Sequence, residues 1–327
     1  MNIIYDSIIN FFIARQNVNT NQNVNTNQNV NTNQNVNTNM LNLELFTINI
    51  QDEKNKNKIL EELINFIKTN PKDLVLLDTS SNKNLSIVEK FVYELGLYHL
   101  RRLGLIKDNL INSVDKYYIE FWFKCETDIP ESKIIHQFHV DKDEELFTKN
   151  NILKCPILST ITYLSDSIYP LVITNIKYDD LSCKENLVNK KKEFTIIFPK
   201  ELRHICFDCK FFHGVVDLEP DNMIHNNKSK LNERIVLVFN IWKNYIPIER
   251  NYFASNKIKT KLYPREKNIL SINPYNKYKI YSEIIPNSNM SKYILNLISD
   301  SHDKYFYKKN INLELAYRSE IVKIISS

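Results

Sequence analysis

The sequence predicts a mainly β fold with flanking helices, of the α+β class. Short runs rich in β-branched and aromatic residues follow one another from Tyr117 to Trp242, and two amphipathic segments of helical period precede them. Polar or proline-containing breaks separate the β-rich runs, and about eight strands in succession predict a sandwich or a barrel. The runs are YYIEFWFKC, IIHQFHVD, PILSTITYLS, PLVIT, EFTIIF, HICF, KFFHGVVDL and RIVLVFNIW.

Two helices are expected before the first of these strands. In residues 52–71 apolar side chains recur at helical spacing until Pro71 ends the segment. Residues 86–104 place their apolar side chains on one side and close with two arginines and Gly104, which is typical of a helix C-terminus.

Four regions follow from these patterns. Residues 1–40 form a tail in which positions 16–39 are four copies of QNVNTN, a low-complexity polar repeat that offers no face to bury, and we expect a disordered spacer there. Residues 41–115 are expected to form an N-terminal helical support region, and residues 116–250 the β core. Residues 251–327 are a C-terminal extension in which SKYILNLIS and LELAYRSEIVKII are predicted helices.

Composition argues against several classes of protein. The chain has only 3 glycines, too few for a glycine-rich phosphate loop, and its net charge of +5 is interspersed rather than clustered as in a dedicated nucleic-acid binder. The 5 cysteines are scattered, and the start MNIIYDSIINFF has neither a basic segment nor a small-residue cleavage site. No apolar run approaches the roughly 18 to 20 residues that span a bilayer. We therefore expect a soluble, intracellular (cytoplasmic) protein without a membrane partner.

The stretch FHVDKDEE contains two metal-ligand types one residue apart. His139 and Asp141 occupy positions i and i+2 of a predicted strand, so both side chains point to one face and can reach the same ion. A third ligand must come from another strand, and KFFHGVVDL supplies His213 beside Gly214, which would allow close backbone approach. Two histidines and one carboxylate form the facial arrangement that holds non-haem iron(II) and leaves coordination positions open.

From about Glu120 to Trp242 the chain resembles the iron(II)- and 2-oxoglutarate-dependent dioxygenases, whose core is a double-stranded β-helix of the jelly-roll or cupin-like kind. HVD, LSTITYLSD, FFHG and RIVLVFNIW carry the resemblance in the family's order, and TYL with FFHG is most similar to the prolyl-hydroxylase-like members. The resemblance implies that His139, Asp141 and His213 are the catalytic metal ligands. It also implies Fe(II), 2-oxoglutarate and O2 as cofactor and co-substrates.

By the same resemblance, Arg234 would bind the distal carboxylate of 2-oxoglutarate, for which a planar bidentate donor is suited, and Tyr163 would offer its hydroxyl to the same group. Every second residue of RIVLVFNIW, starting at Arg234, lies on one face that is otherwise mostly apolar. Two features depart from the family. Arg234 follows His213 by 234 − 213 = 21 positions instead of about ten, which indicates an enlarged loop, and SIYP replaces a glycine pair before the fourth barrel strand.

Three further features have structural interpretations. His204, Cys206 and Cys209 form HxCxxC, which could seed a zinc site but lacks a second ligand pair, so buried thiols are the preferred interpretation. His136 precedes the first ligand by three positions and would face the opposite side of a regular strand. The acids at 143–145 are interpreted as a solvated loop that could contact a substrate.

The resemblance implies an oxygenase that hydroxylates a substrate and releases succinate and CO2. The substrate, a small molecule or a protein side chain, is not identified by these residues. Family members that demethylate nucleic acids carry a second arginine six residues after the first, where this chain has Asn240, which argues against a nucleic-acid partner. Two alternatives stay open: a non-enzymatic β-helix binding module, because a fold does not imply activity, and a cupin-like metalloenzyme that does not use 2-oxoglutarate.

Overall fold

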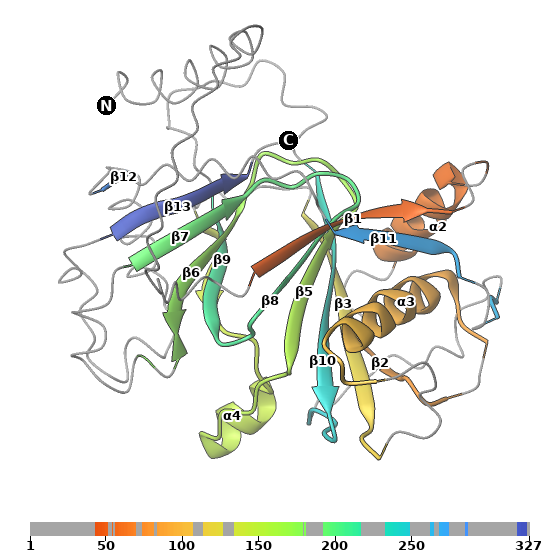
Figure 1. The fold of residues 1–327 in the computed structure, drawn as a ribbon, viewed down its shortest axis with the longest axis horizontal. Helices are drawn as coiled ribbons and strands as arrows, with labels where there is room; N and C mark the ends of the chain where they lie inside the picture. Colours follow the sequence, from red (N-terminus) through yellow and green to blue (C-terminus); the bar gives the residue numbers. More distant parts are fainter. Residues whose placement is uncertain are drawn as a thin grey trace, which may run out of the picture. The chain divides into compact units, whose positions relative to one another are not determined.

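Strands predominate in the part of the chain that the structure describes (Figure 1). The structure is a computed structural model, and its described residues all belong to one compact unit, Met40–Ser327. The tail predicted over residues 1–40 lies outside the described residues. The described residues are 43–51, 54, 56–69, 74–81, 84–106, 114–126, 134–178, 180, 192–216, 233–248, 262–264, 268–274, 285–286 and 319–325.

Two sheets contain these strands, and we call them the large sheet and the small sheet. The large sheet has the order β11-β1-β8-β5-β10-β3-β2, and the small sheet has the order β12-β13-β7-β6-β9-β4. The eight β-rich runs predicted from the sequence form β3 to β10, which confirms the mainly β class. The large sheet comprises β1 (Leu43–Ile50), β2 (Leu74–Asp78), β3 (Tyr117–Glu126), β5 (Leu158–Tyr163), β8 (Arg203–Phe207), β10 (Arg234–Lys243) and β11 (Leu270–Pro274). The small sheet comprises β4 (Ile134–His139), β6 (Leu171–Lys177), β7 (Lys192–Ile197), β9 (Phe211–Val216), β12 (Ile285–Pro286) and β13 (Ser319–Ile325).

An apolar cluster joins the two sheets face to face, and we call the two faces that meet there the inner faces. Strand β10 shows how the period of two divides its residues: Val236 and Val238 contact this inner cluster, whereas Ile235 and Leu237 belong to a second cluster on the outer face. Burying each such side chain contributes about 1.5–3 kcal/mol. The inner cluster consists of Leu45, Ile161, Tyr163, Tyr169, Leu171, Ile173, Ile197, Ile205, Phe207, Phe211, Val215, Val236 and Val238.

Helices α2 (Lys56–Thr69) and α3 (Ile87–Arg102) pack against the outer face of the large sheet (Figure 1). The apolar stripe of α2 is buried there through Ile59, Leu63 and Ile67. Both helices agree with the sequence prediction. No helix in the described part of the chain combines the length and the apolar character needed to cross a membrane.

Local sequence fixes both ends of α3. The Ser86 side chain accepts a hydrogen bond from the backbone N–H of Glu89, whose carboxylate accepts one from the backbone N–H of Ser86, which is a capping box. After the helix, Gly104 has φ of +68°, in the left-handed region that a residue without Cβ adopts at little cost.

The structure adds two strands to the region expected to be helical over residues 41–115. β1 pairs with β8 and β11, and β2 pairs with β3, so both extend the large sheet. Alternating burial along β1 shows that it is a half-buried strand. The sequence did not predict these two strands because they are short, lie far in sequence from the strands they pair with, and adjoin segments of helical period.

The helix predicted for LELAYRSEIVKII is wrong in its last part, because Ser319–Ile325 forms β13. This strand runs parallel to β7, whose other edge pairs with β6. Backbone pairing with β7 overrides the weak helical period of the segment, and its β-branched residues suit a strand. The other predicted C-terminal helix, SKYILNLIS, lies outside the described residues.

Helix α4 (Glu144–Asn150) replaces the solvated loop expected for the acids after β4. Asp143 caps it by accepting a hydrogen bond from the Leu146 N–H at 2.8 Å, and the same carboxylate accepts the Tyr245 hydroxyl at 2.6 Å. Glu144 pairs with Lys142 at 2.6 Å. These acids therefore have structural roles at the end of β4, which helps to fix the segment that carries the candidate ligands.

Candidate metal centre

The three candidate ligands come from the adjacent strands β4 and β9 and the residue segment after β4. His139 is the last residue of β4 and lies opposite His213 in the register of the β4–β9 pair. Asp141 follows outside the strand, where its backbone N–H donates to the Cys209 carbonyl at 3.2 Å. Gly214 permits this close packing, because a Cβ there would lie 2.9 Å from the His136 carbonyl oxygen.

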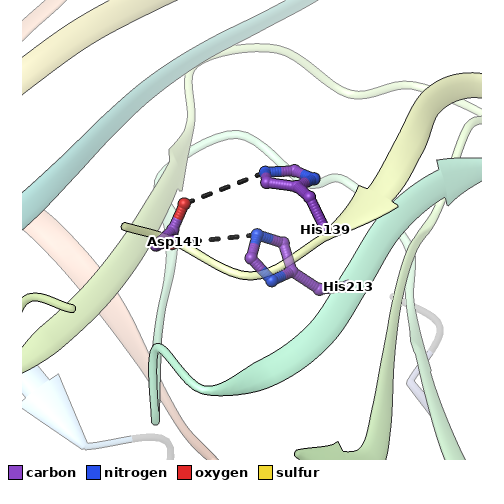
Figure 2. Close-up of side chains that lie close together, drawn as sticks. All are labelled: His139, Asp141 and His213. Atoms are coloured by element: carbon purple, nitrogen blue, oxygen red, sulfur yellow. Dashed lines mark ion pairs between the residues drawn. The ribbon is translucent and has the colours of Figure 1, made fainter. Parts of the chain in front are cut away.

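The side chains of His139, Asp141 and His213 point toward one another (Figure 2). The His139 Nε2 and the His213 Nε2 each lie 3.8 Å from an oxygen of Asp141, and the ligand atoms of all three lie within 4.8 Å of one another. Nitrogen and oxygen ligands lie about 2.0–2.2 Å from a bound first-row ion, so two ligand atoms on opposite sides of one ion are about 4.4 Å apart and others are closer. The two 3.8 Å separations fit such an ion and are too long for hydrogen bonds.

Backbone carbonyls fix the tautomer of both imidazoles. The Nδ1 of His139 lies 2.8 Å from the Gln137 carbonyl oxygen, and the Nδ1 of His213 lies 3.0 Å from the Phe211 carbonyl oxygen. A carbonyl can only accept, so each Nδ1 carries the proton and each Nε2 presents a lone pair toward Asp141. This is the state in which histidine binds a metal ion, and backbone partners of this kind orient metal ligands.

Burial differs among the three residues in a way that suits an open metal site. The side chains of His213 and Asp141 are 6% and 7% exposed, whereas that of His139 is 24% exposed. Desolvation, with the nearby His213 imidazole, lowers the pKa of His139 to about 3, and Asp141 opposes this effect. The His139 ring is therefore neutral near pH 7, and it is the most exposed of the three candidate ligands.

His136 does not point away from the centre, as a regular strand would require. The register of β4 shifts between His136 and His139, and their ring centroids lie only 4.7 Å apart. Lys124 reaches the same ring, with its Nζ 2.8 Å from the His136 Nε2. Burial lowers the pKa of Lys124 to about 8 and lowers that of His136 well below its usual range. The prediction of the opposite face is wrong because an irregularity breaks the period of two.

Arg234 and Tyr163 lie together on the inner face of the large sheet. The guanidinium carbon of Arg234 is 5.8 Å from the centre of the Tyr163 ring, and both side chains are buried. The Tyr163 hydroxyl and the Arg234 Nε have no hydrogen-bond partner among the described residues. Burial raises the pKa of Tyr163, and the positive charge of Arg234 opposes this effect.

Arg234 has a counter-ion that the sequence did not indicate. Its Nη1 lies 2.8 Å from an oxygen of Glu126, which faces it across the β3–β10 pair. The Glu126 carboxylate therefore offsets the buried charge of Arg234 from within the chain. Glu126 and Lys124 alternate with apolar residues along β3, and this pattern was the available signal for two charged side chains on one face.

The HxCxxC residues do not converge on one point. His204 lies on the outer face, where its Nε2 is 2.7 Å from the His99 Nε2 and its Nδ1 is 2.7 Å from the Thr162 hydroxyl. Cys206 and Cys209 are buried, and the Cys209 thiol contacts the Pro156 carbonyl oxygen at 2.9 Å. Within the described ranges, the one group of three or more such side chains close enough to share an ion is the His139, Asp141 and His213 set.

Comparison with known proteins gives distant structural likenesses alone. No protein family and no curated protein matches the sequence. Among solved structures, a prolyl 4-hydroxylase from Pseudomonas putida is 9% identical over 62% of this chain and 93% of its own, with a TM-score of 0.33. EctD from S. alaskensis, solved with 2-oxoglutarate and 5-hydroxyectoine, is 13% identical over 68% of this chain and 84% of its own, with a TM-score of 0.34.

A prolyl 4-hydroxylase structure from Phytophthora capsici is 12% identical over 56% of this chain, with a TM-score of 0.32. This chain spans 53% of the length of that protein. The neighbours are thus prolyl 4-hydroxylases and 2-oxoglutarate oxygenases, but at these TM-scores they establish no function for this chain. An assignment has to come from the side chains of the centre.

Proposed function

We propose that this chain is an iron(II)- and 2-oxoglutarate-dependent oxygenase that hydroxylates a small molecule or a protein side chain. One observation carries the proposal: two imidazoles whose Nδ1 atoms donate to backbone carbonyls direct their Nε2 lone pairs at one carboxylate. Nitrogen and oxygen donors from two histidines and one acid are the ligand set of non-haem iron(II) oxygenases. The strand order β8-β5-β10-β3 facing β7-β6-β9-β4 supports a double-stranded β-helix, or jelly roll, as the core.

In this proposal His139, Asp141 and His213 hold the metal. When bound, iron(II) supplies the chemistry that activates O2 and couples oxidation of 2-oxoglutarate, to succinate and CO2, to oxidation of the substrate. The carboxylate of Asp141 offsets part of the charge of a divalent ion, and the carbonyls of Gln137 and Phe211 keep the two rings oriented. The apolar side chains of the inner cluster would limit the access of water to the space between the sheets.

The polar side chains on the inner face of the large sheet are the proposed site of the co-substrate. Arg234 supplies a positive charge there, and the Tyr163 hydroxyl is free to donate to a carboxylate. A buried hydroxyl without a partner costs free energy, which a bound carboxylate would recover.

The Glu126–Arg234 ion pair favours a second candidate, a cupin-like metalloenzyme that does not use 2-oxoglutarate. Because Glu126 already balances the charge of Arg234, this arginine does not by itself require an external dicarboxylate. In that case the same three ligands would hold a metal for oxygen chemistry with a different reductant.

Oxygen uptake and succinate formation test the proposal. The iron-loaded protein is measured in air with and without 2-oxoglutarate, and metal binding is measured in parallel by calorimetry under nitrogen with Mn²⁺. We expect 2-oxoglutarate to be required for oxygen uptake, with succinate formed in proportion, and Asp141→Ala to abolish both. Uptake that is independent of 2-oxoglutarate would support the cupin-like candidate. A protein that binds no divalent metal would contradict both and leave a binding module.

A further inference from the structure

A row of polar side chains crosses the inner face of the large sheet from β8 to β3. Ile161 and Thr162 of β5 pair with Ile205 and His204 of β8, so the same register places Tyr163 opposite Arg203. The backbone N–H of the neighbouring Leu202 donates to the Tyr163 carbonyl at 2.8 Å, which agrees with this register. Side chains directly opposite in an antiparallel pair have Cβ atoms about 4.5–5.5 Å apart.

The row continues on the other side of Tyr163. Val236 lies opposite Tyr163, so Arg234, two residues before it, is the diagonal neighbour on the same face. Glu126 lies opposite Arg234. The order across the four adjacent strands is therefore Arg203, Tyr163, Arg234 and Glu126.

The row contains two positive side chains, Arg203 and Arg234, and one negative side chain, Glu126. Arg234 has the Glu126 carboxylate at 2.8 Å. Arg203, which is 2% exposed, makes no ion pair with any described residue, and its single hydrogen bond runs from Nη1 to the Phe198 carbonyl. An unpaired cation is costly to bury, so a buried arginine without a counter-ion among the described residues points to a bound anion.

The free atoms of Arg203 also have the geometry for a carboxylate. Its Nε and Nη2 both lack a hydrogen-bond partner, and these two nitrogens form the edge of the guanidinium that binds a carboxylate with two parallel hydrogen bonds. The Tyr163 hydroxyl opposite is likewise without a partner. Arg234, in contrast, already uses its Nη1 for Glu126.

We propose that Arg203, together with Tyr163, binds the distal carboxylate of the co-substrate, while Arg234 remains paired with Glu126. This inference rests on the proposed function for the identity of the ligand, 2-oxoglutarate. It assigns the main anion-binding role to Arg203 on β8 instead of Arg234 on β10, the last strand of the core. The carboxylate balances the buried charge of Arg203 and satisfies the three unpartnered donors on Arg203 and Tyr163.

Calorimetric titration of 2-oxoglutarate into the Mn²⁺-loaded protein under nitrogen tests the assignment. We expect Arg203→Met to weaken 2-oxoglutarate binding by about 10- to 100-fold, because two charge-assisted hydrogen bonds are lost. Arg203→Lys keeps the charge but loses the two-pronged edge and should be intermediate, and it keeps the test available if Arg203→Met does not fold. Mn²⁺ affinity should stay within about threefold in both, because the ligands lie on other elements. Arg102→Gln is the control, since Arg102 is a partly buried arginine on α3, paired with Glu44, away from the inner face.

Thermal unfolding of the metal-free protein gives a second readout that does not depend on 2-oxoglutarate. Without ligand, Arg203→Met should melt at the wild-type temperature or above it, because the substitution removes an uncompensated cation. Arg234→Met should melt below the wild type, because it leaves Glu126 without its partner. A lower melting temperature for Arg203→Met than for Arg234→Met would contradict the charge argument.

The outcomes separate the inference from the proposed function. Wild-type binding of 2-oxoglutarate with unchanged affinity in both Arg203 variants would overturn the inference and leave the proposed function standing. No binding of 2-oxoglutarate by the wild type would overturn the proposed function and, with it, this ligand. In that case succinate decides the carboxylate site: stabilisation of the wild type but not of Arg203→Met would retain Arg203 as a carboxylate site for the substrate, and no stabilisation of either would overturn it.

Discussion

His139 and His213 lie opposite each other in the β4–β9 pair, with ring centroids 4.4 Å apart, and both direct Nε2 to Asp141. At 3.8 Å neither imidazole forms a hydrogen bond with the carboxylate, an arrangement that a shared cation would suit. Adjacent strands therefore bring together a ligand set from positions 72 residues apart, 213 − 141.

The first prediction concerns these ligands. His139→Gln should weaken Mn²⁺ binding by at least about 100-fold, because even the loss of an outer hydrogen-bond partner of a ligand costs about 10- to 100-fold. The melting temperature without metal should change little, since His139 is partly exposed and makes one backbone hydrogen bond. Calorimetry under nitrogen measures the affinity.

His136→Gln is the matched control for this substitution. His136 lies beside His139 in the same strand but does not belong to the group whose ligand atoms converge. Its Mn²⁺ affinity should stay within about threefold of the wild type, since it supplies no ligand atom. If His136→Gln lost metal binding as His139→Gln does, the ligand set would have to include His136.

The second prediction concerns Gly214. A Cβ in Gly214→Ala would lie 2.9 Å from both the His136 carbonyl oxygen and the Phe138 Cδ2, so β4 and β9 would have to separate. Such overpacking should reduce the free energy of unfolding by about 1–3 kcal/mol, and it should also weaken Mn²⁺ binding because β4 carries His139. Urea unfolding and calorimetry measure the two effects.

Gly96→Ala separates general destabilisation from loss of the metal site. Its Cβ would overlap the Cδ1 of Ile119, at the contact between α3 and β3, away from the two strands that carry the candidate ligands. This variant should lose stability and retain Mn²⁺ affinity. Equal loss of affinity in both glycine variants would show that Gly214 acts through overall stability alone.

Local spacing made much of the centre predictable from sequence. HVD places two candidate ligands within three residues, although Asp141 lies just after the end of β4 and not within the strand as predicted, and β-rich runs separated by breaks predicted β3 to β10. A third ligand had to come from another strand, and the glycine beside His213 in KFFHGVVDL favoured that histidine, with which the FFHG resemblance agrees. The sequence did not predict the orientation of His136, because the register shift in β4 has no clear local signature.

Long-range pairing limited the rest of the prediction. Glu126 is 108 residues from Arg234 in sequence, and only the register of β3 against β10 brings the two charges together. Arg203 was missed for the same reason, since its neighbour Tyr163 is on a different strand. Alternation places a residue on a face, but it does not say which residue of another strand lies opposite.

The third prediction concerns the Glu126–Arg234 pair, in which Arg234 is 3% and Glu126 23% exposed. Glu126→Gln should lower the free energy of unfolding by about 1–3 kcal/mol, because it leaves the buried Arg234 without a counter-charge. The double variant with Arg234→Met should recover part of this loss. Urea unfolding of the wild type, the two single variants and the double variant gives the coupling energy between the two side chains, expected at about 1–3 kcal/mol. Strictly additive effects would mean that the two charges do not stabilise each other.

The last prediction concerns the buried His99–His204 pair and the response of stability to acid. Burial lowers the pKa of His204 from 6.5 to about 3, so the folded protein holds its ring neutral where the unfolded chain would take up a proton. Below pH 6.5 the unfolded state therefore binds more protons, and the stability contributed by the neutral ring decreases as the pH falls from 6.5 toward 3. One such group adds a slope of up to about 1.4 kcal/mol per pH unit.

His204→Asn should thus show a shallower loss of stability than the wild type between pH 5 and 6, measured by urea unfolding without metal. At pH 8 the ring is neutral in the folded and in the unfolded state, and the difference there reports the lost hydrogen bonds to His99 and Thr162 together with the lost ring packing against Phe239. Parallel pH profiles for the two proteins would show that His204 does not take up the proton on unfolding.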